Sequence, residues 1–246
     1  MDRMLYIAMS GAKETFLSQA TTANNLANAS TTGFAADLHQ FRSMPVFGEG
    51  MPTRVYAMSE KPAVDFKPGS INATGRDLDV AINGEGWFAV QGTNGSEGYT
   101  RRGDLKIDAN GLVTTSNGLP FIGNDGQIAI PPADKITIGN DGTISIIPQG
   151  GDPEQLEVID RIKMVKPEYQ SMRKSTDGLM RLSSGEDAPA DSNQRLVSGV
   201  LQSSNVNAVN EMVNMIELQR RFEMQVKMMK TAEEMANGAA SLLSNR

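Results

Sequence analysis

The fold of this chain is decided by a stretch near its end, residues 205–243, which reads NVNAVNEMVNMIELQRRFEMQVKMMKTAEEMANGAASLL. No proline interrupts the stretch, and Gly238 is its only glycine. One set of residues recurs at alternating intervals of three and four: Met215, Leu218, Phe222, Gln225, Met229, Ala232, Ala236, Ala239 and Leu243. This a/d spacing is typical of helices that pack side by side. It predicts one long helix over 206–243, about 57 Å long at about 1.5 Å per residue.

A second apolar line lies on the same predicted helix and consists of Met224, Met228, Met235 and Leu242. At about 100° per residue, it is about a quarter turn from the first line. A single apolar stripe usually packs within one subunit, whereas two stripes predict one partner inside the subunit and another outside it. The alternative is burial inside one large domain, but the rest of the chain offers few helices to cover this one.

The start of the chain predicts a second helix, over about 2–28. Its apolar positions are Leu5, Ala8, Met9, Ala12, Phe16, Ala20, Ala23, Leu26 and Ala27. Because this face is mostly alanine, another helix can approach it closely, and we expect the part from Ala12 to Ala23 to pack on the terminal helix. Gly33 is a plausible left-handed residue just past the helix end.

The middle of the chain has a different pattern. Residues 34–76 contain four prolines and no sustained period, which predicts an extended connector with one or two strands, at 53–58 and 63–66. From residue 77, short apolar runs alternate with Asn-Gly and Asp-Gly pairs, which supply the positive φ angles of tight hairpins. The sequence therefore predicts an antiparallel β-rich domain over 77–203. The fold class is α+β: paired N- and C-terminal helices (1–33 and 204–246) in a coiled-coil domain, with the β domain inserted between them.

Composition narrows the function. A net charge of −6 argues against a broad nucleic-acid surface, and no apolar run reaches the roughly 20 residues of a membrane span. Cysteine is absent and there is one histidine, so no metal site or cofactor is predicted. The start of the chain does not resemble a cleaved secretory signal. No P-loop, nucleophile-elbow or zinc-protease motif occurs, so we do not expect an enzyme.

Two candidate ligand sites have simpler structural interpretations. Residues 108–111 resemble part of a calcium loop but lack its leading acid and its closing glutamate, so a hairpin turn explains them better. Trp87 and Tyr99 could form a platform for a sugar, as in a secreted carbohydrate-binding β protein with helical oligomerisation ends. Trp87 follows a turn in an apolar strand, however, and we expect it to be a core residue.

Residues 24–34 read NNLANASTTGF, which resembles the N-terminal signature of the rod and hook proteins of the bacterial flagellum. The middle is similar through LDVAINGEGWFAV (78–90), YTRRGDLKIDANGLV (99–113) and ITIGNDGTISI (136–146), and the end through SNVNAVNEMVNMIELQRRFEMQVKMM (204–229). Together they cover most of the chain in the family's order. EGYTR (97–101) and RRFEMQVK (220–227) look most like the proximal-rod branch, with the distal-rod branch as the near alternative.

The resemblance implies a structural subunit of the flagellar basal body that self-assembles, through its terminal helices, into the torque-transmitting rod. It implies export by the flagellar type III apparatus without a cleaved signal, a periplasmic location, and contacts with copies of itself and with other rod proteins. Nucleic acid and membrane insertion are not implied. The residues expected at the assembly interface are Leu5, Ala8, Ala12, Phe16, Ala20, Ala23, Asn24, Asn25, Leu26, Asn28, Gly33, Phe34, Met215, Leu218, Phe222, Met224, Met228, Met229, Met235, Leu242 and Leu243.

Overall fold

The computed structural model describes residues 4–45, 55–59, 63–150 and 156–244. It is an α+β chain with a helix at each end and a β-rich middle, as the sequence predicts. The chain divides into two compact units. The helical unit comprises Met1–Ala29, Ala36–Asp65 and Val206–Arg246, and the β unit comprises Ser30–Ala35 and Phe66–Asn205. Residues 36–65, which were expected to form part of a connector, thus group with the helices.

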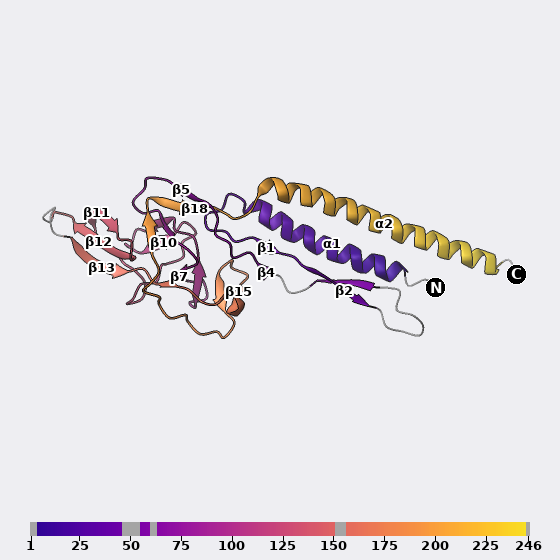
Figure 1. Ribbon diagram of the computed structural model, residues 1–246, viewed down its shortest axis with the longest axis horizontal. Coiled ribbons are helices and arrows are strands. Elements are labelled where there is room, and N and C mark those ends of the chain that lie inside the picture. Colours follow the sequence, from indigo (N-terminus) through magenta and orange to yellow (C-terminus); the bar gives the residue numbers. More distant parts are fainter. Residues whose placement is uncertain (1–3, 46–54, 60–62, 151–155, 245–246) are drawn as a thin grey trace. The chain divides into compact units, whose positions relative to one another are not determined.

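The helical unit is built on two helices, α1 (Met4–Ala27) and α2 (Ala208–Ser244). They pack side by side and run antiparallel (Figure 1). Two short antiparallel pairs accompany them: β1 (Asp37–Leu38) with β4 (Ala63–Val64), and β2 (Phe41–Pro45) with β3 (Val55–Ser59). Both β1 and β3 contact α1. Of the predicted strand at 53–58, residues 53 and 54 lie outside the described part.

Local sequence explains where the helices begin and end. Asn207 precedes α2, and its side-chain oxygen accepts hydrogen bonds from the backbone N–H groups of Val209 (3.0 Å) and Asn210 (3.2 Å). This is an N-cap, and Glu211 adds a favourable negative charge in the first turn. After α1, Gly33 has φ +64°, the left-handed conformation that favours glycine.

The β unit contains one five-stranded sheet and several smaller ones. The larger sheet has the order β14 (Met164–Val165), β7 (Trp87–Gln91), β8 (Glu97–Thr100), β16 (Met180–Leu182), β15 (Met172–Lys174). A three-stranded sheet has the order β11 (Ala133–Ile138), β12 (Thr143–Pro148), β13 (Glu157–Arg161). Three two-stranded pairs are β9 (Leu105–Ile107) with β10 (Val113–Thr115), β6 (Val80–Ile82) with β17 (Leu196–Ser198), and β5 (Ile71–Ala73) with β18 (Val200–Gln202). All of these pairings are antiparallel, as expected.

The β unit has a continuous apolar core. Phe88 and Phe121 are fully buried there, with their ring centroids 5.8 Å apart in an edge-to-face arrangement. Around them pack aliphatic side chains from most of the strands, including Val80, Val90, Leu105, Ile144 and Ile146. Glycines of the Asn-Gly and Asp-Gly pairs, such as Gly111 and Gly142, have positive φ angles, as hairpin turns require.

Candidate assembly surface

One face of α2 lies against the chain's own N-terminal helix. Among residues 208–241 of α2, whose side chains are described, those that are buried or half-buried recur at strictly alternating intervals of three and four: Ala208, Glu211, Met215, Leu218, Phe222, Gln225, Met229 and Ala232. From Met215 to Ala232 these are the residues of the predicted first line. We call this face the α2 seam. Ala236 and Ala239, the next two residues of the predicted line, are exposed.

The face of α1 opposite this seam differs from the one predicted. The prediction placed Phe16, Ala20 and Ala23 against the terminal helix, but all three are exposed, and Phe16 is 61% exposed. Of the predicted face, Ala8 and Ala12 are buried. The other buried positions of α1 carry small polar side chains, namely Thr15, Ser18, Thr22 and Asn25. A face of small residues lets the larger α2 side chains approach, whereas Phe16 would hold the helices apart.

One direct polar contact ties the two helices together. The Thr15 hydroxyl lies 3.2 Å from Oε1 of Gln225 and 2.8 Å from the carbonyl oxygen of Gly11. With Thr15 opposite Gln225, the antiparallel heptad spacing places Thr22 opposite Leu218 and Ala8 opposite Ala232. All four of these residues are buried or half-buried, so spacing and burial give the same register.

The second apolar line of α2 is exposed. Met224 is 60% exposed, Met228 40% and Met235 55%. We call these three residues the methionine line. Other large apolar side chains of α2 are exposed as well: Val209, Met212, Val213, Ile216 and Val226. Two apolar surfaces therefore exist on α2, and α1 covers one of them.

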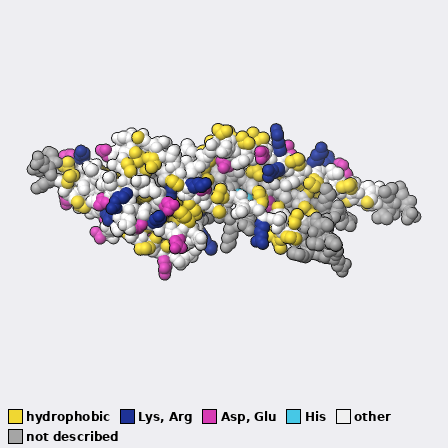
Figure 2. Space-filling model, in the orientation of Figure 1, with side chains coloured by type: hydrophobic (Ala, Val, Ile, Leu, Met, Phe, Trp, Pro, Cys, Tyr) yellow, Lys and Arg dark blue, Asp and Glu magenta, His cyan; other side chains and the backbone are white. Residues whose placement is uncertain are grey.

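The uncovered side of α1 is apolar too. Its exposed large apolar residues are Leu5, Tyr6, Met9, Phe16 and Leu17. Figure 2 shows hydrophobic side chains at the surface of the helical unit, interspersed with charged ones. We call the exposed apolar residues of α1, together with those of α2, the outer faces.

The predicted strand at 53–58 corresponds to β3, but the sequence analysis did not predict its partner β2 or the apolar surface that the two strands expose. The β2–β3 pair contacts α1, and the Ser10 hydroxyl donates to the Ala57 carbonyl oxygen at 3.1 Å. The pair exposes large apolar side chains at Phe41, Met44, Val55 and Met58. The four apolar residues in two short runs were the signal that could have indicated this surface.

The asparagines of the NNLAN…GF segment (24–34) make hydrogen bonds within the chain, where α1 ends and the backbone turns toward β1. The Asn25 amide donates to the Asp37 carbonyl oxygen, and the Asp37 N–H donates to the Asn25 side-chain oxygen, both at 2.9 Å. Asn28 donates from its amide to the Asn24 carbonyl oxygen at 2.9 Å. Asn25 is therefore a clamp between α1 and β1, and Asn28 closes the last turn of α1.

Gly33 and Phe34 belong to the β unit. The Gly33 N–H donates to the Gln202 carbonyl oxygen at 2.8 Å, and a Cβ at Gly33 would lie 2.4 Å from the Arg101 carbonyl carbon. The Lys174 ammonium lies 4.3 Å from the centroid of the Phe34 ring. Only glycine fits at position 33, because both its φ angle and the nearby backbone exclude a side chain.

These placements separate the described residues of the predicted interface into buried, half-buried and exposed groups. Ala8, Ala12, Asn25, Gly33 and Leu218 are buried within the chain, so they cannot offer surface to a neighbour. Met215, Phe222 and Met229 are half-buried in the α2 seam, and Leu26, Asn28 and Phe34 are also half-buried. The exposed members are Leu5, Phe16, Ala20, Ala23, Asn24, Met224, Met228 and Met235. The side chains of Leu242 and Leu243 lie outside the described part.

The aromatic platform required by the carbohydrate-binding alternative is not available at Trp87. Trp87 is 2% exposed, as expected for a core residue, and the Arg101 guanidinium lies 4.7 Å from its ring centroid. Burial lowers the pKa of Arg101, while Tyr169 and Glu85 oppose that shift. Because the indole ring is almost completely buried, neither of its faces is open for a sugar to stack on.

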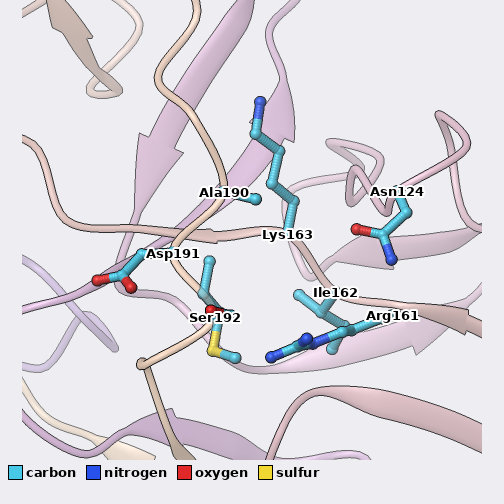
Figure 3. A pocket seen from close by; sticks show the side chains of 8 residues that line it. Asn124, Arg161, Ile162, Lys163, Ala190, Asp191 and Ser192 are labelled. Carbon is cyan, nitrogen blue, oxygen red and sulfur yellow. The ribbon is translucent and has the colours of Figure 1, made fainter.

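Figure 3 shows a small pocket of about 70 Å³ in the β unit. Its lining residues are Asn124, Arg161, Ile162, Lys163, Met164, Ala190, Asp191 and Ser192. The charged side chains are engaged elsewhere: Lys163 pairs with Glu97 at 2.8 Å, Arg161 donates to the Asp141 carbonyl oxygen, and Asp191 accepts from the N–H of Asn193. In the figure Lys163 extends away from Arg161. The pocket therefore lacks convergent groups for chemistry.

The described residues give no metal-binding cluster either. No group of three or more His, Cys, Asp or Glu side chains among them could hold a metal ion. Asp108 of the calcium-like loop accepts hydrogen bonds from the N–H groups of Asn110 (2.8 Å) and Leu112 (2.9 Å), as in a turn. Within the described part of the chain, no helix has both the length and the apolar character of a membrane span.

Comparison with known proteins places the chain among flagellar proteins along most of its length. Residues 5–34 match the model of the flagella basal body rod protein family, residues 81–146 that of the flagellar hook protein FlgE/F/G D1 domain, and residues 197–242 that of the flagellar basal body rod FlgEFG protein C-terminal region. The chain is 44% identical to the flagellar basal-body rod protein FlgF of Escherichia coli (strain K12), over 99% of both chains. It is 42% identical to FlgF of Salmonella typhimurium, again over 99% of both. Identity to the flagellar basal-body rod protein FlgG of Buchnera aphidicola subsp. Schizaphis graminum is lower, at 29% over 97% of this chain and 98% of that one.

Proposed function

Because this chain belongs to the FlgF family of flagellar basal-body rod proteins, we propose that it assembles into the proximal rod by burying its outer faces against neighbouring subunits. The chain is a structural rod subunit and not an enzyme. The proposal concerns the contact between neighbouring subunits: which residues pack together there, and which interactions stabilise them.

The observation that carries the proposal is the exposure of the methionine line next to a helix face that is already occupied. Monomeric proteins rarely expose large continuous apolar surfaces, and such surfaces usually mark contacts with other proteins. Burying one large apolar side chain contributes up to about 1.5–3 kcal/mol. Three methionines, with the exposed apolar residues of α1, can therefore drive association once other subunits cover them. Methionine also suits this role, because its flexible side chain adapts to more than one neighbour.

In this proposal the two sides of α2 have different partners. The α2 seam packs on α1 of the same subunit as an antiparallel coiled coil, with small residues of α1 facing large residues of α2. The methionine line packs on helices of adjacent subunits. The partners are copies of this chain and other rod proteins.

The family also suggests a route and a place. We propose that the chain passes unfolded through the flagellar export apparatus and assembles in the periplasm. The absence of cysteine agrees with this route, because no disulfide could form on the way. The test is to arrest the flagellar export apparatus and follow the chain: it should then stay in the cytoplasm, whereas periplasmic chain in the arrested strain would contradict export by this route.

The assembly proposal is tested by placing charge on the methionine line. Met224→Asp and Met228→Asp together should leave the purified protein folded, because both side chains are exposed, yet exclude it from isolated basal bodies. Gln219→Asp is the control, since it adds a charge at an exposed polar position of the same helix. Circular dichroism checks the fold, and immunoblots of basal bodies check incorporation. Normal incorporation of the double variant in a motile strain would overturn the proposal.

A further inference from the structure

We propose that Gln225 determines the register in which the two terminal helices pair, because its side chain packs against Gly11 of α1 and lies within hydrogen-bond distance of Thr15. This inference rests on the α1–α2 pairing and is independent of how the outer faces assemble. Gln225 is the only amide side chain in the α2 seam, and it interrupts an otherwise apolar run from Met215 to Ala232.

The first reason is the fit at Gly11. A Cβ added to Gly11 would lie 2.8 Å from Nε2 of Gln225 and 3.3 Å from its Cδ, so the amide occupies the space that a side chain would need. Gly11 is the only glycine of α1. Thr15 lies one turn further along the same face, and its hydroxyl proton is within reach of both the Gln225 oxygen (3.2 Å) and the Gly11 carbonyl oxygen (2.8 Å). Space and a hydrogen-bond donor therefore coincide at one place on α1.

The second reason is that a slipped register loses this match. A slip by one heptad in one direction places Ala8 opposite Gln225, and the alanine side chain offers no hydrogen-bond donor. A slip in the other direction places Thr22 opposite Gln225, with Ser18 in the position that Gly11 occupies in the native register. The Ser18 side chain would then fill the space that the amide needs. A single polar residue at an a or d position is known to specify register at some cost in stability.

The third reason is that the other side-chain contacts between α1 and α2 repeat. The buried α1 face consists of small residues, and such a face accepts large partner side chains at several offsets. The α2 seam repeats similar apolar residues at each heptad. Backbone hydrogen bonds from the Gly33 N–H to the Gln202 carbonyl oxygen and from the Asn205 N–H to the Phe34 carbonyl oxygen join the segments that lead out of α1 and into α2. Within the seam itself, the contact of Gln225 with Gly11 and Thr15 is the one that fits at a single offset.

The experiment measures register directly in the full chain. Because the sequence has no cysteine, Lys13→Cys and Asn214→Cys give two unique nitroxide sites, both at exposed positions. In the native register the two sites are offset by about 20 Å along the helix axes, and a slip of one heptad changes that offset by about 10 Å. Pulsed electron–electron double resonance distinguishes these distances.

We expect one narrow distance for the otherwise unchanged chain. Gln225→Leu and Gly11→Ala should each add a second maximum displaced by about 10 Å, the first by removing the amide and the second by excluding it. Matched controls are Gln219→Leu, at an exposed glutamine of α2, and Gly238→Ala, where an added Cβ meets open space. Both controls should keep one distance.

Three results would overturn the inference. A single unchanged distance in both Gln225→Leu and Gly11→Ala would show that the register is set elsewhere. A broad distribution in these variants alone would show that the contact supports pairing and not register. A broad distribution in the parent labelled chain would show that no register exists to select. None of these results depends on incorporation into basal bodies, so they leave the assembly proposal to its own test.

Discussion

The two units of this chain differ in what they bury. The β unit has a core of fully buried aromatic and aliphatic side chains, whereas the buried apolar residues of the described helical unit are Ala8, Ala12, Ala36 and Leu218. The surfaces show the reverse. Among described residues, all large apolar side chains that are exposed belong to the helical unit except Ile71, Leu156, Val158 and Val197.

This contrast shows where each unit obtains its stability. The β unit is stabilised from within, so it should fold without partners. The helical unit buries little apolar area, and helices gain most of their stability from packing. We therefore expect neighbouring subunits to complete its stabilisation. The following predictions test the contrast, from the largest expected effect to the smallest.

Phe88→Ala should have the largest effect on the isolated chain. Phe88 is fully buried against Phe121, and truncating such a residue costs about 3–5 kcal/mol of unfolding free energy. Trp87 is the only tryptophan, so its fluorescence reports unfolding of the β unit. The matched control is Phe16→Ala, at an exposed position of α1, which should change the unfolding free energy by less than about 0.5 kcal/mol. Equal losses of unfolding free energy in the two variants would contradict the conclusion that the β unit is stabilised by its own core.

Gly33→Ala should come next and should also affect the β unit. The substitution forces a left-handed residue to carry a Cβ that would collide with the Arg101 backbone, and we expect a loss of roughly 2–4 kcal/mol. Gly178→Ala is the control, since Gly178 has φ +80° but faces open space, so only the cost of about 1–2 kcal/mol for the backbone conformation applies. Urea unfolding followed by Trp87 fluorescence measures both. Similar losses would argue against the close approach at Gly33.

Phe222→Asp should affect the helical unit alone. It places a charge in the half-buried α2 seam and should cost roughly 2 kcal/mol of helix pairing. We expect a loss of helical circular dichroism with unchanged Trp87 fluorescence, and a non-motile strain. Met224→Asp, two residues away on the outer face, should keep the helical signal. A motile strain carrying Phe222→Asp would rule out the α2 seam as described.

The smallest effect concerns pH. Burial raises the pKa of Tyr99 above its ordinary value of 10.0, and its hydroxyl oxygen accepts a hydrogen bond from the Ala188 N–H. A raised pKa means that the unfolded chain loses this proton first, so the contribution of Tyr99 to stability is fully present below pH 10 and is lost as pH rises further. The slope contributed by Tyr99 is at most about 1.4 kcal/mol per pH unit. Tyr99→Phe should remove that slope when urea unfolding is repeated between pH 9 and 11, and an unchanged slope would contradict the burial effect.

Sequence reasoning succeeded where burial follows hydrophobicity. The α2 seam was predicted from its spacing, and Trp87 was predicted to be in the core. The Asn110-Gly111 and Asp141-Gly142 turns predicted the β9–β10 and β11–β12 hairpins, whereas Asn83-Gly84 joins β6 and β7, which pair with other strands. These features depend on local pattern, and their residues are strongly apolar or strongly turn-forming.

Sequence reasoning failed where burial depends on the partner. Thr15, Ser18, Thr22 and Asn25 are buried because they are small enough to lie under α2, and no scale of hydrophobicity selects them over Phe16. The strands β15 and β16 are only three residues long, Met-Arg-Lys and Met-Arg-Leu, so they carry no alternating pattern long enough to predict a strand. The β1 strand is held partly by the Asn25 side chain, which a strand pattern cannot reveal.

The central claim is that the methionine line is exposed in the free chain and covered in the rod. Met228→Cys gives a single thiol on this line, and Glu186→Cys gives one at an exposed position of the β unit. Maleimide labelling of each should be compared between purified chain and isolated basal bodies. The account predicts that labelling at position 228 is rapid in the free chain and at least tenfold slower in basal bodies, while position 186 labels readily in both. Equal labelling of position 228 in the two states would contradict it.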